Sequence, residues 1–372
     1  MVTTRPGQSF ASAEAEVARA ALLRRDTALL RELLRAGNDL LAVLEERILV
    51  VSQLIARRAA EGVPQTAGSV VRLAQSRALL AEGERQLQIL ASTSETLITG
   101  AQRANIEAAV GDALRLVDGQ LPGGLRVADL RALGIEWAVV DADALVTFVG
   151  TLRDGSTLSN YLERHVVDGT MDDVRRILRS GLSDNPRVTA RRLRGAFAGG
   201  QVQAMRVART ETLRAYREAE RAQYAANPRL VQGYRRMEAL DDRTCVACWM
   251  LDGTLYRTSS EMDEHVQGRG FLVPELVPPR DLGIPLDPEP RPPAGREVFK
   301  RLPAERQRKI IGNQKMFDAW KSGEISDAGL VRHTVDPIWG ASTSANSAVR
   351  ALRGDHIRAL PDIDEFYDPA SP

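Results

Sequence analysis

Cysteine and aromatic residues are scarce in this chain. Two of its 372 residues are cysteines, which is too few for a disulfide framework and indicates a reducing compartment. Aromatic residues make up 5% of the sequence, whereas alanine, leucine and arginine abound. These three residue types lose little side-chain freedom in a helix, so the composition predicts a mainly α protein.

Neither sign of charge predominates. The chain has 50 basic and 49 acidic residues, a net charge of +1, so its overall charge does not attract it to nucleic acid or to an anionic membrane. It also lacks an apolar run of about 18 residues, and its first ten residues lack the apolar stretch of a secretory signal. We therefore expect a soluble protein, made in a cytoplasm, without a membrane partner.

Apolar residues recur at helical spacing from about Ala11 to Ala60. They are Leu22, Leu29, Leu33, Leu40, Leu44, Ile48, Val51 and Ile55. Glycine and proline within Glu61–Pro64 should break this helix, with a second helix over Thr66–Gly100 and a third up to about Val117. We expect residues 1–120 to form a helical arm, a long hairpin plus a further helix, that is either a plain bundle or a docking surface for a partner.

A helical connecting region is expected over residues 121–200. It begins after the breaker sequence Leu121–Gly124 and consists of shorter helices. These are expected around Asp141–Leu152, Thr157–Val166, Met171–Arg179 and Thr189–Phe197. Gly199–Gly200 then separate this region from the strongest helix of this half, Val202–Ala226.

An α+β domain is expected over residues 201–340. VQGYRRMEAL fits a short strand, and Asp252–Gly253 fits a tight turn between two extended pieces, so a small antiparallel sheet is predicted. Eight of the 18 prolines lie between Pro274 and Pro293, which predicts an extended strap. An amphipathic helix over Ala304–Ser322 and a polar tail over 341–372 follow.

The two cysteines form the most conspicuous chemical motif, Cys245-Val-Ala-Cys248. Two thiolates at this spacing can hold one zinc ion, with His265 as a third ligand. A closed structural site needs a fourth ligand, either water or a carboxylate. The carboxylate candidates are Asp252, Asp263 and Glu264.

Two other interpretations of the cysteine pair stay open. Free cysteines often pack as small buried apolar residues. A redox dithiol is the third possibility, but that motif normally opens a helix, and the residues after Cys248 suggest a strand and a turn instead.

The order of motifs in this half resembles the C-terminal domain of the phage Mu F-like minor head proteins. ARTETLRAYREAE is followed by DDRTCVACWMLDGTLY and a downstream histidine, and the run from Leu302 to Ile325 resembles the closing helix of that family. The matching residues are Arg209, Thr210, Glu211, Asp241, Cys245, Cys248, Asp252, Gly253, His265 and Arg269. The chain departs from the family at Gly268 and Gly270, where the family has two cysteines, so a metal site closed by protein ligands is in doubt.

The resemblance implies a structural minor head protein of a tailed phage, without catalytic residues. It would act in prohead assembly with the portal protein and with scaffold or major capsid protein, first in the host cytoplasm and then inside the virion head. Because Arg209 and Glu211 lie on different faces of one helix, we expect one of them to bond to the Asp241–Cys248 segment and join helix to sheet.

Double-stranded DNA is a further candidate partner. The densest basic stretch contains Arg187, Arg191, Arg192 and Arg194, which is usually a solvated helix face but can also contact phosphates. Two rival functions are a metal-dependent or thiol enzyme built on the cysteines and His265, and a freestanding DNA-binding protein. The near-neutral charge counts against the second rival.

Overall fold

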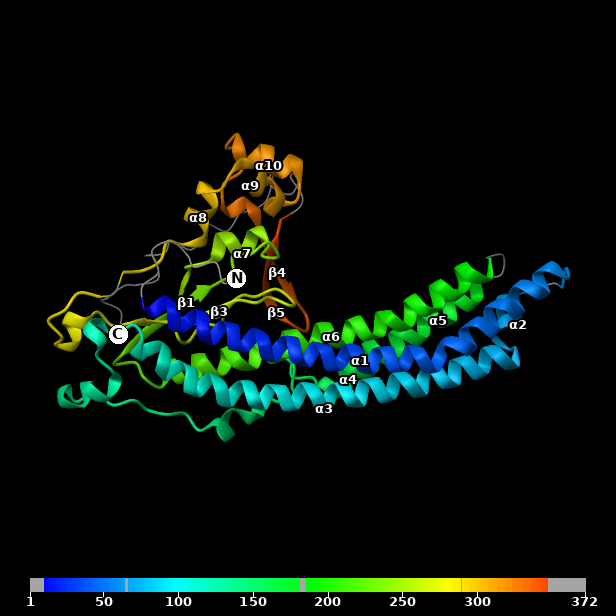
Figure 1. Cartoon of the computed structure of the whole chain (residues 1–372), viewed down its shortest axis with the longest axis horizontal. Helices are drawn as coiled ribbons and strands as arrows, with labels where there is room; N and C mark the ends of the chain where they lie inside the picture. The colour runs from blue at the N-terminus through cyan, green and yellow to red at the C-terminus, as the bar shows by residue number, and fades with distance from the viewer. Residues whose placement is uncertain (1–9, 64–65, 181–184, 289, 347–372) are drawn as a thin grey trace. The chain divides into compact units, whose positions relative to one another are not determined.

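The computed structural model describes residues 10–63, 66–180, 185–288 and 290–346 (Figure 1). The protein is mainly α, with two small antiparallel sheets in its C-terminal part, as the sequence predicts. The chain divides into two compact units. We call them the helical unit (25–102 and 148–212) and the α+β unit (the described parts of 1–24, 103–147 and 213–372).

Three long helices contribute residues to both units: α1 (Phe10–Ala60), α3 (Ala74–Asp118) and α6 (Pro186–Ala225). The predicted end of α1 is confirmed, since the chain turns at Gly62 with a φ of +69°. After the short helix α2 (Ala67–Val71), α3 continues through Gly100, so the predicted division into a second and a third helix is wrong. Glycine within a helix costs only about 1 kcal/mol, which the packing of a long helix offsets.

The predicted apolar stripe of α1 is buried at all of its positions. The buried positions repeat every 11 residues, as at Leu22, Leu33, Leu44 and Ile55. In α3, Ser94 and Asn105 are buried at the same interval. Eleven residues complete three helical turns, so an 11-residue period keeps one face of a long helix turned toward its neighbours.

The rest of the helical unit consists of α4 (Leu158–Leu162), a π-helical turn over Glu163–Asp168 and α5 (Gly169–Ser180). α6 passes through Gly199 and Gly200, where a break was expected. A Cβ atom on Gly200 would lie 2.7 Å from the Thr170 hydroxyl of α5. Glycine therefore permits close packing of α6 against α5 at this point instead of ending the helix.

The α+β unit contains a three-stranded antiparallel sheet in the order β2-β1-β3. Its strands are β1 (Val231–Met237), β2 (Leu255–Tyr256) and β3 (Phe271–Leu276). In the register of the sheet, Tyr234 lies between Tyr256 and Pro274. One sheet face packs on the ends of α3 and α6 and on the 3-10 turn Val127–Leu133. The predicted strand and small sheet are confirmed.

A second core joins short helices to a hairpin. These elements are α7 (Val246–Leu251), α8 (Gly295–Arg301), α9 (Ala304–Ile311), α10 (Gln314–Lys321), β4 (Val331–Asp336) and β5 (Gly340–Ala345). The extended segment predicted before Asp252 is wrong, because α7 is helical. Its six residues are all buried, and a short apolar run buried all round has no periodicity that separates helix from strand.

The predicted helix over Ala304–Ser322 is two helices, α9 and α10. Gly312 ends α9 with a φ of +72°, a backbone conformation that favours glycine, and the Asn313 side chain accepts a hydrogen bond from the Met316 amide to begin α10. The expected tail starts too early, since 340–345 form β5, while 347–372 lie outside the described residues.

The proline-rich strap is confirmed as largely non-helical. Between β3 and α8 it contains one 3-10 turn, Pro279–Leu282. Among the described helices, none is both long and apolar enough to cross a membrane.

Candidate metal centre

The cysteines lie at the start of α7. Cys245 is the residue that caps the helix, and Cys248 lies in its first turn. The segment before the helix is fixed by Asp241, whose carboxylate accepts hydrogen bonds from the Arg243 amide at 3.0 Å and from the Thr244 hydroxyl at 2.9 Å. The sequence therefore presents both sulfur atoms from one tight corner.

His265 reaches the two sulfur atoms from the loop before β3. Its Nε2 atom lies 3.3 Å from the Cys248 sulfur and 3.7 Å from the Cys245 sulfur, and the sulfurs are 3.5 Å apart. Tetrahedral zinc at its usual bond lengths would separate these sulfur and nitrogen atoms by about 3.5–3.8 Å, which the observed spacings approach to within about 0.3 Å. The three predicted ligands therefore fit one zinc ion.

A backbone carbonyl orients the imidazole of His265. The Nδ1 atom lies 2.9 Å from the Val266 carbonyl oxygen, which can only accept, so Nδ1 carries the proton and donates it. Nε2 is then directed toward the sulfurs, and it can donate its lone pair to a metal once it has lost its proton. Metal-bound histidines are oriented in the same way by a hydrogen bond from the other ring nitrogen.

Of the three acids predicted as a fourth ligand, Glu264 is the one beside the cluster. Its Oε1 lies 3.7 Å from His265 Nε2. Asp252 is engaged elsewhere, because its two oxygens accept hydrogen bonds from the amides of Glu238 and Gly295 at 2.6 and 2.8 Å. Among the described residues, Asp263 is in neither grouping of potential metal ligands, whereas Glu264 forms one with Glu238 and Cys248.

Arg236 is a buried cation beside this cluster, and sequence reasoning missed it. Its guanidinium donates to Glu238 at 2.6 Å, to Glu264 at 3.0 Å and to the Cys248 sulfur at 3.4 Å. Although burial opposes it, the two carboxylates raise the pKa of Arg236 well above its usual range. One signal was present: a strand turns successive residues to opposite faces, so one of two adjacent arginines in β1 had to face the interior.

Without a metal ion, the two cysteines differ in pKa, since the pKa of Cys245 is lowered and that of Cys248 is raised. The Cys248 thiol hydrogen-bonds to the Cys245 sulfur and lowers the pKa of Cys245 to about 4, with help from His265. The same hydrogen bond, together with burial, raises the pKa of Cys248. Burial opposes protonation of His265, but the Cys245 sulfur and the Glu264 charge raise its pKa to about 9. At neutral pH the metal-free site is thus a thiolate–imidazolium pair.

Glu264 fills the space beside Gly268 and Gly270. A Cβ atom on Gly268 would lie 2.1 Å from the Glu264 carboxyl carbon, and one on Gly270 would lie 2.4 Å from its Oε2. The Gly270 amide instead donates to that oxygen at 3.1 Å. The two glycines leave room for this carboxylate, which explains physically how the chain accommodates the departure.

The structure brings several of the other motif residues to the same place. Arg269 forms two parallel hydrogen bonds to Asp241, of 2.8 and 2.7 Å, and these lower the pKa of Asp241. Asp252 holds the end of β1 to the start of α8, and Gly253 adopts a φ of +87° in the predicted turn.

Of the two residues expected to bond to the Asp241–Cys248 segment, Arg209 or Glu211, the prediction is wrong for Arg209. Arg209 pairs with Asp26, at 2.8 Å within the helical unit, and Asp241 is taken by Arg269. Thr210 bonds back to the Arg206 carbonyl, and Glu211 is buried in the same unit.

The contact from α6 to the metal centre is made by Arg217. Its guanidinium donates to the Gly270 carbonyl at 3.2 Å, and the side chain is buried. Arg217 lies eight residues, about two turns, beyond Arg209. The expectation named Arg209 or Glu211 and the Asp241–Cys248 segment, whereas the observed contact joins Arg217 to Gly270.

The structure removes the argument against a redox dithiol, which was that a strand and not a helix would follow the cysteines. Cys245 begins a helix, which is where the attacking thiol of a redox dithiol normally lies. The geometry therefore leaves metal binding and dithiol chemistry open, whereas simple apolar packing does not account for the imidazole directed at both sulfurs.

The arginines predicted to contact DNA are exposed on α6. Arg194 pairs with Glu45 and Arg192 donates to the Ser180 hydroxyl at 2.9 Å. Upstream, Arg175 and Arg176 pair with Asp172 and Asp173. Three arginines of this stretch, Arg175, Arg176 and Arg194, are therefore paired with acidic side chains.

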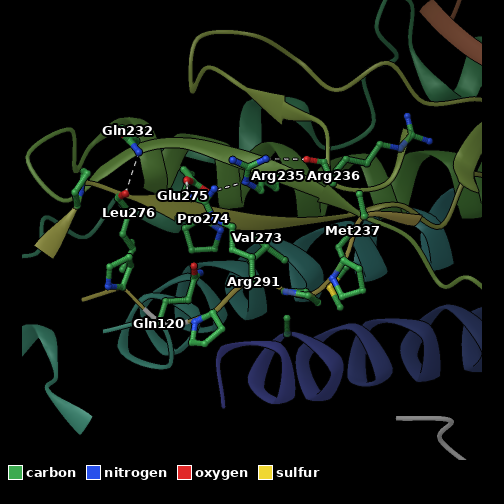
Figure 2. Close-up of a pocket in the computed structure, with 18 of the residues that line it drawn as sticks. Gln120, Gln232, Arg235, Arg236, Met237, Val273, Pro274, Glu275, Leu276 and Arg291 are labelled. Atoms are coloured by element: carbon green, nitrogen blue, oxygen red, sulfur yellow. Dashed lines mark hydrogen bonds and ion pairs between the residues drawn. The ribbon is translucent and has the colours of Figure 1, made fainter. Parts of the chain in front are cut away.

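A cavity of about 420 Å³ lies between the sheet and the proline-rich strap (Figure 2). Three of its charged groups are paired with one another, since Arg235 and Arg291 both bind the Glu275 carboxylate. The Gln232 side chain donates to the Leu276 carbonyl at 3.0 Å. With its polar groups satisfied and prolines around it, the cavity fits an apolar group better than a reacting one.

Compared with known proteins, the chain matches no family model, no curated protein and no solved structure.

Proposed function

We propose that this chain is a structural minor head protein of a tailed phage, a part of the prohead that performs no catalysis. The observation that supports this proposal best is the convergence of the family-like motif. Residues separated by up to 28 positions, from Asp241 to Arg269, form one partly buried cluster around the two cysteines and His265. Such a cluster joins a helix, a sheet and two loops, which is a scaffold function.

A zinc ion fits this proposal as a structural cross-link. Cys245, Cys248 and His265 would hold it, and Glu264 or a water would complete the site. When bound, zinc adds folding energy by tying the start of α7 to the loop before β3. Arg236 balances the buried negative charge of the sulfurs and carboxylates around it.

The helical unit supplies the second part of the proposal. Its long helices form a stiff element whose exposed faces can be recognised by the portal protein, by scaffold or by major capsid protein. The α+β unit carries the part of the motif from Asp241 to Arg269 and the cluster around the cysteines. Recognition by surfaces, with no bond made or broken, is then the whole mechanism.

The test is incorporation into proheads. The chain is produced together with the portal, scaffold and major capsid proteins encoded beside its gene, and purified proheads are analysed by quantitative mass spectrometry. We expect a few copies in each prohead, and fewer when Cys245→Ser and His265→Ala weaken the α+β unit. Absence of the wild-type chain from proheads, or a gene without such neighbours, would contradict the proposal.

A further inference from the structure

Positive charge is concentrated on the three short helices α8, α9 and α10. The segment 295–321 contains eight basic and three acidic residues, a net charge of +5, whereas the whole chain has +1. All four lysines of the chain lie in it: Lys300, Lys309, Lys315 and Lys321. The sequence as a whole conceals this patch, because the rest of the chain has a net charge of −4.

Three of the eight cations already have partners. Lys300 binds Asp327 at 2.6 Å, Arg306 lies 3.4 Å from Asp242, and Lys321 donates to Gln307 at 3.3 Å. Among the described residues, no ion pair engages the remaining five. We call them the α8–α10 basic face: Arg296, Arg301, Arg308, Lys309 and Lys315.

Helix stability explains only part of this basic face. Arg301, Arg308 and Lys309 lie in the last turns of α8 and α9, where a cation interacts favourably with the helix dipole. Arg296 and Lys315 lie in the first turns of α8 and α10, where the dipole disfavours positive charge. Helix stability therefore does not account for these two cations.

The connection between α9 and α10 gathers three of these cations. Arg308 and Lys309 lie in the last turn of α9, Lys315 lies in the first turn of α10, and Gly312 and Asn313 lie between the two helices. The positive φ of Gly312 makes this corner tight. The cations are therefore held near one another by a core that includes Ile311 and Met316.

We propose that the α8–α10 basic face binds the phosphate backbone of double-stranded DNA. Long basic side chains on exposed helices suit a regular polyanion, and lysine binds phosphate as a point charge. The nearby aromatic residues offer no platform for unpaired bases, because Trp320 donates to Asp327 and packs edge-on against Phe299. The ligand is therefore duplex backbone without sequence readout. This inference deepens the proposed function, since a head protein meets packaged DNA.

The test measures binding of the full chain to a fluorescein-labelled duplex of about 30 base pairs at increasing salt. The variant R301Q/R308Q/K309Q/K315Q removes four exposed charges and breaks no ion pair among the described residues. At about 100 mM salt we expect at least tenfold weaker binding. The slope of log affinity against log salt should become shallower by about 0.9 for each phosphate that the variant no longer neutralises.

A matched variant, R187Q/R191Q/R192Q/R194Q, removes the same charge from α6 and should retain affinity within about twofold. The swap K309R/K315R should also retain binding, because charge and not lysine itself is required. Melting temperatures of all variants check the fold.

The inference is overturned if wild-type protein does not bind the duplex at low salt, or if the α6 variant loses as much affinity as the α8–α10 variant. It is also overturned if polyglutamate competes as well as DNA at equal charge. Incorporation into proheads is measured on the same variants. Wild-type protein that enters proheads but does not bind DNA would sink this inference alone, whereas exclusion from proheads would sink the proposed function.

Discussion

Arg269 and Asp241 meet in two parallel hydrogen bonds that close the two loops of the metal centre against each other. Lysine cannot form this paired geometry, so Arg269→Lys should lower the free energy of unfolding by about 1–2 kcal/mol at pH 7. Urea unfolding measures the change. Arg243→Gln is the control, because Arg243 is exposed and lies 3.7 Å from the same carboxylate, and it should cost less than about 0.5 kcal/mol.

The Arg269–Asp241 pair should also make the stability of the protein depend on pH in the acid range. Because the pKa of Asp241 is lowered in the folded protein, its contribution is complete above the unfolded pKa of about 3.9 and is lost as the pH falls below it. Wild-type protein and Arg269→Lys should therefore converge in stability below about pH 4. A difference that persists unchanged in acid would show that the ion pair is not its source.

Zinc binding is a separate prediction. Protein purified without chelator should contain about one zinc per chain by elemental mass spectrometry, and Cys245→Ser or His265→Ala should reduce this to background. Removal of the metal should lower the melting temperature. His165→Ala is the matched control, since this histidine stacks on Tyr161 in the helical unit and should leave the zinc content unchanged. Metal-free wild-type protein with an unaltered melting temperature would count against a structural metal.

Substitutions of Arg209 and Arg217, both in α6, should differ in their effect on zinc affinity. Arg217→Ala removes a buried hydrogen bond to the loop that carries Gly270, so it should weaken zinc binding by about 10–100-fold, as removal of a supporting residue around a metal site does. Arg209→Ala breaks the pair with Asp26 and should lower stability without changing zinc affinity. Competition with a chromogenic chelator measures both variants. Equal effects on zinc affinity would contradict the assignment of Arg217.

Because Glu264 fills the space beside Gly268, the effects of substitutions at these two positions on stability should not be additive. Gly268→Ala should destabilise the protein by about 1–3 kcal/mol, because the new methyl group meets the Glu264 side chain. In a Glu264→Ala background the same substitution should cost much less. A double-mutant cycle from urea unfolding gives the interaction energy, and additive effects would mean that the carboxylate does not fill this space.

Glu220 predicts a dependence on pH away from the metal centre. Burial raises the pKa of this carboxyl well above its usual value. The Glu220 carboxyl therefore binds a proton more tightly in the folded protein than in the unfolded chain. Its contribution to the free energy of unfolding is complete below the unfolded pKa and is lost as the pH rises through the folded pKa. Glu220→Gln should gain on wild type by up to about 1.4 kcal/mol per pH unit above pH 4.5, until the folded pKa is reached. The exposed Glu107→Gln should not, and a flat difference would refute the prediction.

The sequence predicts α1 and the strap well, because a long stripe and a run of prolines are each dominated by one signal. It fails at α7, where an apolar segment buried all round has no periodicity. It also fails at Gly199–Gly200, which look like a breaker but serve close packing against Thr170. In both cases tertiary packing overrides the local pattern.

The ligand set was predictable, but the groups that support it were not. Cys245, Cys248 and His265 lie together, as predicted. They could be singled out from the sequence because cysteine and histidine are rare in this chain. Arg236 and Arg217 do not stand out in a chain with so many arginines, and only the fold selects which of them is buried. The partner of Asp241 was likewise chosen by the fold, since Arg209 and Arg269 are equally plausible on charge alone.

The 11-residue period of the long helices has a consequence for length. Removing or adding 11 residues shifts a helix by three whole turns, about 16 Å, and returns the same side chains to the same face. If α1, α3 and α6 change together by this step, each buried position meets an equivalent neighbour again. The helical unit can therefore become longer or shorter in steps of 11 residues while its buried side chains keep the same packing.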